Sequence, residues 1–454
     1  MTQTPPYQVT NPATGAVLET FPFATDAEVE SALARAAAAY ETWRATPIDE
    51  RVSVVKRVAA LFSERSAELG ELITTEMGKS PADAAGEAGF CAEIFGYYAD
   101  QGPGLLADQP LPGHPGGRIE HLPIGPLLGV MPWNYPYYQV ARFAAPNLVA
   151  GNTIILKHAE NCPTSARAIA QLMADAGVPD GVYVNLFATH EQVATMIADP
   201  RVRGVSLTGS ERAGTAVAEA AGRHLKKVVL ELGGSDPYIV LDTDDVDATA
   251  ETAWQTRIAN MGQACNSNKR MIVMDEVYDD FVAGLVERAS AMTPRTDADG
   301  YSPMVSRKAA EGLLAQVRDA VDKGATLHVG GELGDHAWFS PAVLTGVTPE
   351  MRAWHEELFG PVAVVYKVST DDEAVELANA VDFGLGGAVW STDEERATRV
   401  AQRLDVGMAN VNLPAADGFA DVPFGGTKRS GFGRELGPLG IGEFVNQRVF
   451  YVQR

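Results

Sequence analysis

The amino-acid sequence predicts an α/β protein with two doubly wound parallel sheets. From about residue 127, short β-rich runs alternate with amphipathic helical stretches, as in strand–helix–strand units. A second alternating series begins near Tyr238. Two successive series in a chain of 454 residues indicate two α/β domains with a cleft between them.

The segment before residue 127 is expected to supply packing helices and no chemistry. Thr25 and Asp26 cap a first helix, Pro47 precedes a second, and a third covers residues 87–98. The Gly/Pro-rich stretch 101–117 is expected to leave this domain, and residues 118–122 alternate as one strand of a projecting hairpin.

The two strand series are defined by their apolar runs. In the first series, helices are expected over 165–176 and 211–221, and in the second a helix is expected over 246–260. The strands are LLGVM, TIILK, VYVNL, GVSLT and KVVLEL, then YIVL, MIVMD, ATLHV, VAVVYKV, GGAVWS and GMANVN.

The amino-acid composition disfavours several classes of function. The chain has 36 Lys and Arg against 59 Asp and Glu, a net charge of −23, which disfavours binding to nucleic acid or to a membrane surface. The uncharged stretch 122–141 holds four prolines, so we expect buried strand and loop there, with no transmembrane span. Three dispersed cysteines and no visible signal peptide lead us to expect a cytoplasmic protein.

Three motif-like segments fail on inspection, and a metal site is not expected. Gly78-Lys79-Ser80 resembles the end of a P-loop, but Ile73 stands where the upstream glycine is needed. His355-Glu356 and His190-Glu191 both lack the second histidine of a zinc-protease helix. The chain also lacks G-x-G-x-x-G, so any dinucleotide must bind through another loop.

Three residues have side chains suited to catalysis. Cys265 lies in a small-residue turn, where it is either a nucleophile or a buried structural thiol. Glu231 ends an apolar strand before a double glycine, as a general base or a capping carboxylate. Asn134 lies between two prolines, as an oxyanion donor or a turn residue.

Two further positions suit phosphate or ribose binding. Thr208-Gly209-Ser210 opens a helix whose free N–H groups could hold a pyrophosphate. Lys157 lies at the carboxyl end of a strand, where parallel sheets bind ligands. Each signal is weak alone.

Together the motifs form a much stronger pattern. PWNYP, ILKHAE, SLTGSERAG, LELGG, GQAC, EELFGP and PFGGTKRSGFGRE occur in this order, and over essentially the whole chain they resemble the aldehyde dehydrogenase superfamily. ILKHAENCP, LELGGSDP and PFGGTKRSGFGREL most resemble bacterial succinate-semialdehyde dehydrogenases of the short, KHA-containing type. His158 and Ser235 depart from the wider family and fit this subgroup.

The resemblance implies NAD(P)-dependent oxidation of an aldehyde to a carboxylic acid. Cys265 would attack the aldehyde to form a thiohemiacetal, Asn134 and the Cys265 N–H would hold the oxyanion, and Glu231 would activate the water that hydrolyses the thioester. Succinate semialdehyde is the expected substrate, with its carboxylate bound by Arg142 or, as a second candidate, by Arg257.

The resemblance also implies the cofactor residues. Lys157 would bind the adenine-side ribose, and a carboxylate at Glu160 accepts a ribose 2′-hydroxyl and repels a 2′-phosphate, so we favour NAD, with NADP possible. The remaining residues expected at the cofactor are Met131, Trp133, Asn134, Gly209, Ser210, Leu232, Glu357 and Phe359.

The implied organisation has three parts. Residues 1–104 and 124–231 form the dinucleotide-binding domain, 232–425 the catalytic domain, and 105–123 with 436–454 an oligomerisation arm and tail. We expect a homodimer or a homotetramer.

Three alternatives remain open. A CoA-acylating aldehyde dehydrogenase is disfavoured by the presence of Glu231, and a non-catalytic binding protein by the presence of both Cys265 and Glu231. The third is a dehydrogenase of another aliphatic or aromatic aldehyde, for which Tyr137, Trp254 and Phe419 could line a less polar pocket.

Overall fold

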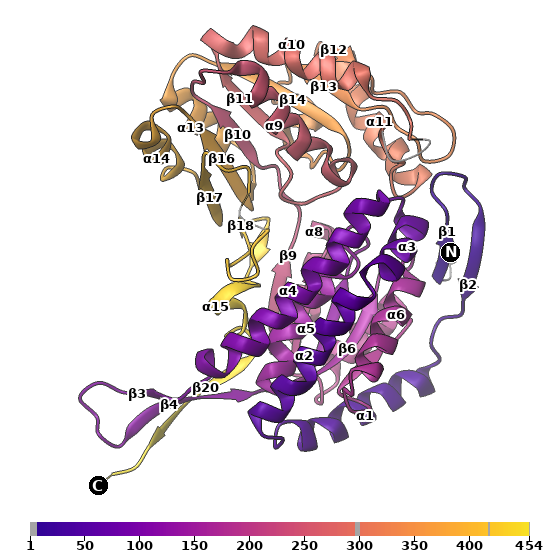
Figure 1. The fold of residues 1–454 in the computed structure, drawn as a ribbon, viewed down its shortest axis with the longest axis vertical. Helices are drawn as coiled ribbons and strands as arrows, with labels where there is room; N and C mark the ends of the chain where they lie inside the picture. Colours follow the sequence, from indigo (N-terminus) through magenta and orange to yellow (C-terminus); the bar gives the residue numbers. More distant parts are fainter. Residues whose placement is uncertain (1–6, 296–299, 416–417, 454) are drawn as a thin grey trace.

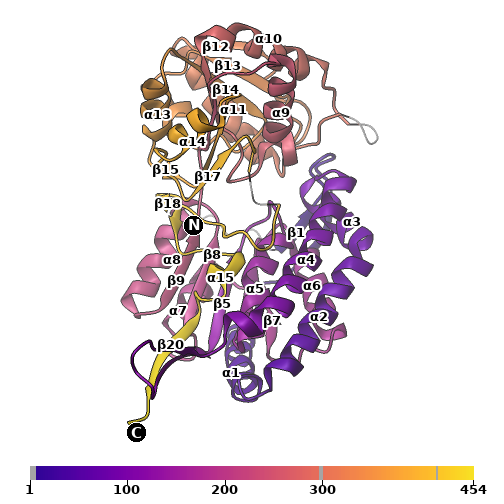
Figure 2. The same ribbon diagram turned by 60° about the vertical axis from the view of Figure 1, so that its left-hand side comes forward.

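The computed structural model describes residues 7–295, 300–415 and 418–453. The described chain contains a six-stranded sheet, a seven-stranded sheet and a three-stranded sheet (Figures 1 and 2). The six-stranded sheet lies in the lower half of Figure 1 and the seven-stranded sheet in the upper half, while the three-stranded sheet projects at the lower left beside the C-terminus.

The six-stranded sheet has the order β19-β9-β8-β5-β6-β7, and only β19 is antiparallel. Its strands are apolar and largely buried because helices cover the sheet. They are β5 (Pro126–Met131), β6 (Thr153–His158), β7 (Tyr183–Asn185), β8 (Gly204–Thr208), β9 (Lys227–Glu231) and β19 (Gly431–Phe432).

The helices of this half include the longest in the described chain. Thr25 forms a capping box with Glu28 at the start of α1, as expected from the sequence. The helices are α1 (Asp26–Trp43), α2 (Ile48–Glu64), α3 (Ser66–Met77), α4 (Pro81–Leu105), α5 (Tyr138–Ala150), α6 (Pro163–Asp175), α7 (His190–Ala198) and α8 (Glu211–Arg223). A hairpin of β1 (Tyr7–Thr10) and β2 (Val17–Phe21) precedes them.

Helix α4 is longer than the expected 87–98, because Ser80 caps it and Pro81 occupies its first turn. Its internal glycines have a low helix propensity, so the sequence does not indicate the full length of the helix. Packing against α2, α3 and α5 stabilises it. Gly78 ends α3 with a φ of 82°, and Lys79 pairs with Glu87 in the interior, so this segment is no P-loop.

The seven-stranded sheet has the order β12-β13-β14-β11-β10-β16-β17, with only β12 antiparallel. Its strands are β10 (Pro237–Val240), β11 (Arg270–Met274), β12 (Thr326–Val329), β13 (Ala342–Thr345), β14 (Val362–Val368), β16 (Gly386–Trp390) and β17 (Met408–Val411). Its helices are α9 (Val246–Ile258), η1 (Ala259–Gly262), α10 (Asp275–Ala291), α11 (Arg307–Asp322), α12 (Arg352–His355), α13 (Asp371–Asn379) and α14 (Glu394–Ala401).

After this sheet the chain returns to the first half. β15 (Phe383–Gly384) pairs with β18 (Thr427–Lys428), and β19 then joins β9 beside Glu231. Following α15 (Gly437–Gly440), β20 (Val445–Tyr451) pairs with β4 (Gly117–Pro123), which also pairs with β3 (Gln109–Pro110). This return brings Gly433-Arg434-Glu435, called the GRE motif below, beneath the junction of the two halves.

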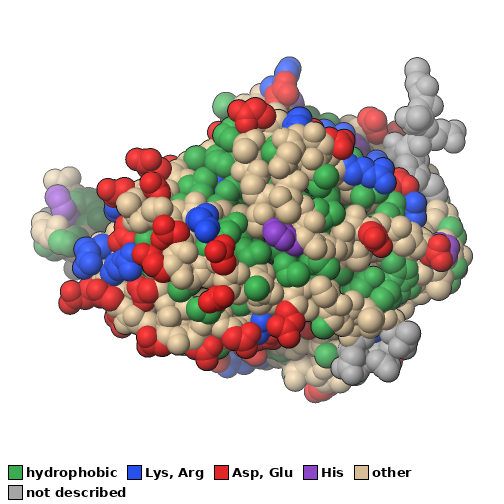
Figure 3. Space-filling view, turned by 90° about the horizontal axis from the view of Figure 1, so that it is seen from above, with side chains coloured by type: hydrophobic (Ala, Val, Ile, Leu, Met, Phe, Trp, Pro, Cys, Tyr) green, Lys and Arg blue, Asp and Glu red, His purple; other side chains and the backbone are tan. Residues whose placement is uncertain are grey.

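The described surface fits the negative net charge. Seen from above the upper half, acidic side chains lie along the edges and are more prominent than basic ones (Figure 3). No helix of the described residues is long and apolar enough to cross a membrane, and no group of potential ligands there could hold a metal ion.

Candidate active site

A cavity of about 360 Å³ lies where the two halves of the chain meet. Helices α4 and α5 contribute from one half, and the loop carrying Cys265 contributes from the other. Four charged residues, Lys79, Asp83, Glu87 and Arg142, and the aromatic residues Phe90, Tyr135, Tyr138 and Phe424 also line it. The cavity therefore presents a partly exposed thiol to a space lined by apolar, basic and acidic side chains.

An unusual turn places Cys265 at this cavity. Asn260, Met261 and Gly262 have successive φ values of 48°, 55° and 67°, all in the left-handed region. Asn260 Nδ2 donates to the carbonyl of Asn134 at 2.9 Å, and Asn134 Nδ2 donates to the carbonyl of Gln263 at 3.1 Å. The strained loop is thus fastened to the segment after β5, and Asn134 lies beside the thiol-bearing turn.

Lys269 holds the same loop from the other side. Its Nζ donates to the carbonyls of Ala264 and Cys265, each at 2.7 Å, and pairs with Glu357 Oε1 at 3.1 Å. Burial raises the pKa of the Cys265 thiol to about 12, while the charges of Arg142 and Lys269 act in the opposite direction. This thiol therefore needs a base or a bound ligand to ionise.

The double glycine after Glu231 permits a close approach of backbones. A Cβ on Gly234 would lie 2.4 Å from the carbonyl oxygen of Cys265, and one on Gly233 would lie 2.6 Å from Glu357 Oε2. The Gly234 N–H donates to Glu357 Oε1 at 3.1 Å. Gly233-Gly234 thus connects the end of β9 with the Cys265 loop, as a larger residue could not.

Glu231 lies at the end of β9 with 1% of its surface exposed. Neither carboxylate oxygen has a hydrogen-bond partner among the described residues. Burial, and then the nearby charge of Glu435, raise its pKa well above the ordinary value, while Arg142 and Arg434 oppose this rise. An unpartnered carboxylate with a raised pKa has the properties of a general base.

Arg142 is fully buried and lies in the wall of the cavity. Its Nε pairs with Glu435 Oε2 at 2.8 Å, and its guanidinium stacks on Phe424 and Tyr138 at 4.3 and 4.7 Å. Burial acts to lower the pKa of Arg142. The charge of Glu435 and those of other nearby groups, including Glu231 and Cys265, outweigh this effect and raise the pKa above its ordinary value. Its Nη1 has no hydrogen-bond partner among the described residues.

Arg257 does not lie at this cavity, so its expected role as a substrate residue is wrong. Its guanidinium is fully buried and donates to the carbonyls of Val362, Leu358 and Gly360 and to Ser267 Oγ. These bonds connect α9 to the loops around Glu357 and Cys265. With its donors engaged, Arg257 fixes the scaffold and has none directed at a ligand.

The aromatic residues of the alternative pocket are also elsewhere. Tyr137 donates from its hydroxyl to the Leu69 carbonyl in the core, and Trp254 belongs to the core of the upper half. Phe419 is 53% exposed and is not among the residues that line the cavity. None of these three residues therefore lines the cavity that holds Cys265.

A second cavity, of about 320 Å³, lies between α7 and α8. Small apolar residues of these helices line it, with Lys157, His190 and Arg212 at its polar side. Lys157 is 4% exposed, and its Nζ lies 2.5 Å from Glu160 Oε1; His190 Nε2 lies 3.3 Å from the same oxygen. A flat apolar slot beside a buried ammonium fits an adenine and its ribose.

The other expected cofactor residues are not among those that line the two cavities. Ser210 caps α8, accepting from the Ala213 N–H at 3.4 Å, and the preceding Gly209 donates to the carbonyl of Glu231 at 2.9 Å. Trp133 and Phe359 form an edge-to-face pair at 5.6 Å. Met131 and Leu232 are buried.

Several residues that organise the site were given no structural role in the sequence analysis. His158 is buried and neutral, with burial lowering its pKa to about 4, and its Nε2 contacts the Pro136 carbonyl at 2.9 Å. Glu87 accepts from the N–H groups of Tyr137 and Tyr138 at the start of α5. Glu435 was inside the GRE motif, the one signal that could have drawn attention to it, whereas Lys269 and Glu87 had no local signal.

This fold, with a thiol, a buried carboxylate and an amide at the junction of two parallel-sheet domains, defines a class of enzyme. The sequence model of the aldehyde dehydrogenase family matches residues 1–450, and the chain belongs to this family. The expected family and fold are confirmed.

Among its relatives is a protein of Deinococcus radiodurans named succinate-semialdehyde dehydrogenase [NADP(+)]. It is 54% identical over 450 residues, covering 98% of this chain and 94% of the relative. A solved succinic semialdehyde dehydrogenase from Streptococcus pyogenes in complex with NADP⁺ is 40% identical, with a TM-score of 0.95 and coverage of 99% and 100%. A Pseudomonas syringae aldehyde dehydrogenase solved with NAD⁺ and octanal is 33% identical, with a TM-score of 0.93 and coverage of 98% and 93%.

Proposed function

We propose that this protein oxidises succinate semialdehyde to succinate with a nicotinamide cofactor. The observation that carries the proposal is Arg142, which lines the cavity that also holds Cys265 and whose Nη1 has no hydrogen-bond partner among the described residues. A semialdehyde with a carboxylate at its far end can place that group on the guanidinium while its carbonyl carbon faces the sulfur. The relatives named as succinate-semialdehyde dehydrogenases support this choice.

The chemistry begins at Cys265. Its thiolate adds to the aldehyde carbon and forms a thiohemiacetal. Asn134 Nδ2 has two hydrogens, of which one is bonded to Gln263, so the other is free to hold the oxyanion together with the Cys265 N–H. When bound, the nicotinamide ring supplies the hydride acceptor. Glu231 then takes a proton from the water that attacks the resulting thioester and releases the acid.

The described residues fit a nicotinamide cofactor. The cavity between α7 and α8 supplies an apolar slot, and Lys157 supplies a donor for ribose or phosphate oxygens. Glu357 is already held by Lys269 and the Gly234 N–H, which fixes it for the second ribose. Trp133 and Phe359 give the aromatic contact expected beside the nicotinamide.

For the cofactor type we infer NADP⁺, whereas Glu160 by itself favours NAD. Lys157 and His190 both contact the Glu160 carboxylate, which offsets its repulsion of a 2′-phosphate. Arg212 adds another cation to the same cavity. Two of the relatives are named or solved with NADP⁺, which supports the inference.

The exposed arm supports self-association. Val449, Phe450, Tyr451 and Val452 remain partly or largely exposed on or just after β20. Burial of such a row against a second copy would remove apolar surface from water. We therefore propose a homo-oligomer, either a dimer or a tetramer.

A second candidate is the oxidation of an uncharged aldehyde. Phe90, Tyr135, Tyr138 and Phe424 line the cavity, and the P. syringae relative was solved with octanal. The experiment compares reduction of the cofactor with succinate semialdehyde and with butyraldehyde, which has the same chain length without the carboxylate. A large preference for the semialdehyde is expected. Equal kcat/KM values would favour the second candidate.

Two variants test the chemistry and the cofactor. Cys265→Ala should abolish oxidation while cofactor binding persists, and substantial residual turnover would refute the covalent mechanism. Glu160→Gln should lower the KM for NADP⁺ more than that for NAD⁺, because it removes the remaining negative charge. Higher kcat/KM with NAD⁺ than with NADP⁺ in the unaltered protein would contradict our inference.

A further inference from the structure

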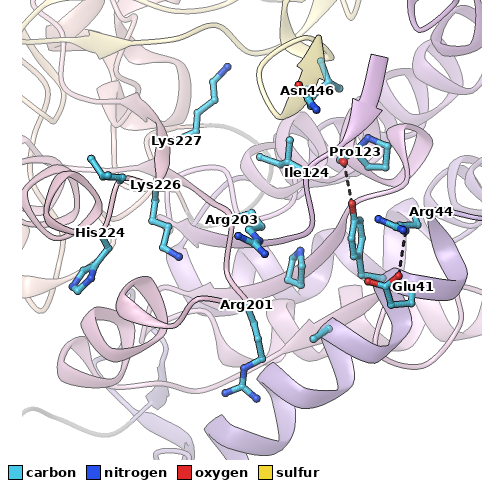
Figure 4. Close-up of a pocket in the computed structure, with 15 residues that line it drawn as sticks. Glu41, Arg44, Pro123, Ile124, Arg201, Arg203, His224, Lys226, Lys227 and Asn446 are labelled. Carbon is cyan, nitrogen blue, oxygen red and sulfur yellow. Dashed lines mark hydrogen bonds and ion pairs between the residues drawn. The ribbon is translucent and has the colours of Figure 1, made fainter. Parts of the chain in front are cut away.

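A basic groove lies on the lower half of the molecule, away from both cavities described above. It has a volume of about 850 Å³ and is bordered by α1, the start of β5, the turn between α8 and β9, and the first residues of β20 (Figure 4). Strand β9 starts here at Lys227 and ends at Glu231, so the groove lies at the opposite edge of the sheet from the catalytic carboxylate.

The charge of the groove is opposite to that of the chain. Five Lys or Arg residues and one histidine line it, against the single carboxylate of Glu41. Over the whole sequence acidic residues outnumber basic ones by 59 to 36. A local reversal of this kind attracts anions to one place on a protein that elsewhere repels them.

Half of these cations already have a carboxylate partner. Arg44 pairs with Glu41, Arg201 with Glu30 and Asp199, and Lys227 with Glu443. In Figure 4 the Arg201 side chain points away from Arg203 and Lys226. These three residues shape the groove, and their charges are largely compensated.

Lys226, Arg203 and His224 are the basic residues of the groove that form no ion pair with a carboxylate among the described residues. Lys226 Nζ donates to the carbonyls of Asp199 and Val202 at 2.9 and 2.6 Å, which fixes the ammonium and leaves its third hydrogen free. Arg203 and His224 make no ion pair with a carboxylate among the described residues. In Figure 4 the ends of Lys226 and Arg203 point toward one another.

The proximity of Lys226 and Arg203 is electrostatically unfavourable. Burial, and then the charge of Arg203, lower the pKa of Lys226, while the charge of Asp199 opposes this decrease. An anion that contacts both Lys226 and Arg203 would relieve the repulsion between their charges. A group with several negative charges matches this arrangement better than a chloride ion does.

An apolar surface adjoins the cations. Leu225 is 93% exposed, with a left-handed φ of 51° in the turn after α8. Pro123 and Ile124 face the groove from the other side. An exposed leucine in a strained turn beside a cation pair provides a contact for the carbon-rich part of a charged ligand.

We infer that this groove binds a phosphorylated metabolite of nucleotide size, with its phosphates on Arg203, Lys226 and His224 and its apolar part on Leu225. The volume lies in the range of small-molecule sites. This ligand is separate from the redox cofactor, whose cavity lies between α7 and α8.

The test uses the full chain saturated with NADP⁺, so that the cofactor site is closed to the probe. Calorimetric titration with ATP should show one additional site, and Arg203→Gln/His224→Gln should weaken it at least about tenfold through loss of charge-assisted bonds. Arg57→Gln, an exposed arginine on α2, is the matched control and should leave the affinity unchanged.

Inorganic triphosphate separates the two parts of the inference. It should bind more weakly than ATP, and Leu225→Ser should remove that difference. Equal affinities of ATP and triphosphate would overturn the assigned role of Leu225. The site would be overturned if neither probe bound at millimolar concentration. Loss of binding on saturation with NADP⁺ would also overturn it, and so would equal affinities of the double variant and the unaltered protein.

Discussion

The Nε of Arg142 lies 2.8 Å from Oε2 of Glu435, and both side chains are almost completely buried. This ion pair joins α5 to the segment that returns beneath the catalytic junction. It fixes the guanidinium in the wall of the cavity, with Nη1 still unpartnered. The charge of the same carboxylate also raises the pKa of Glu231, so Glu435 acts on both the proposed substrate residue and the proposed base.

The first prediction concerns the substrate carboxylate. Removing Arg142 alone would leave Glu435 buried without its partner, so both are changed together, as Arg142→Met/Glu435→Gln. The KM for succinate semialdehyde should rise about tenfold or more, because a charge-assisted bond is lost. The KM for butyraldehyde should change little. Steady-state kinetics with both aldehydes checks this, and equal changes would refute the carboxylate clamp.

The second prediction concerns pH. The charge of Glu435 raises the pKa of Glu231, while Arg142 lowers it. Glu435→Gln removes the first effect and leaves Arg142 uncompensated, so both consequences lower the pKa of Glu231. The acid limb of the kcat profile should therefore move to lower pH. Glu311→Gln, at an exposed pair on α11, is the control; a shift to higher pH in Glu435→Gln would contradict the assignment.

The third prediction concerns stability. Because the pKa of Glu231 is raised in the folded protein, stability is greatest below its unfolded pKa and falls as pH rises toward the folded value. Glu231→Gln is neutral at every pH and should raise Tm by roughly 1–3 °C at pH 8, with the gain disappearing near pH 4. Scanning calorimetry at both pH values measures this difference.

The same variant should stop after one turnover, because the thioester no longer has its base. Rapid mixing should show close to one equivalent of reduced cofactor per active site, followed by very slow turnover. Sustained turnover at the normal rate would mean that another group activates the water.

The fourth prediction concerns the double glycine. A Cβ at Gly234 would overlap the Cys265 carbonyl, so Gly234→Ala should move the nucleophile and lower kcat/KM on the order of 100-fold. Gly222 near the end of α8 has no atom within 4 Å of an added Cβ. Gly222→Ala is therefore the matched control and should retain full activity. Comparable activity of both variants would show that the close approach is unimportant.

The order of the motifs predicted the fold class and the family. Each motif reflects local requirements of the backbone, and such requirements can be recognised in the sequence alone. The two strand series and the helix cap at Thr25 were accessible in this way, and so were the residues proposed to carry the chemistry, Cys265, Glu231 and Asn134. The structure also bears out the rejection of the P-loop-like segment, since Gly78 ends a helix there.

Contacts between distant segments required the tertiary structure. Arg142 and Arg257 are both arginines on helices near the proposed catalytic motifs, and the sequence ranked Arg142 first but could not show the contacts of either. Folding surrounds Arg257 with backbone carbonyls and places Arg142 at a cavity beside Glu435, 293 positions later in the chain. The local sequence pattern determined which reactive side chains the protein has. Only the packing of distant segments decided which charged side chains have a partner of opposite charge and which can bind a ligand. The physical reason is that burial and the distance to a partner set the energy of a charge.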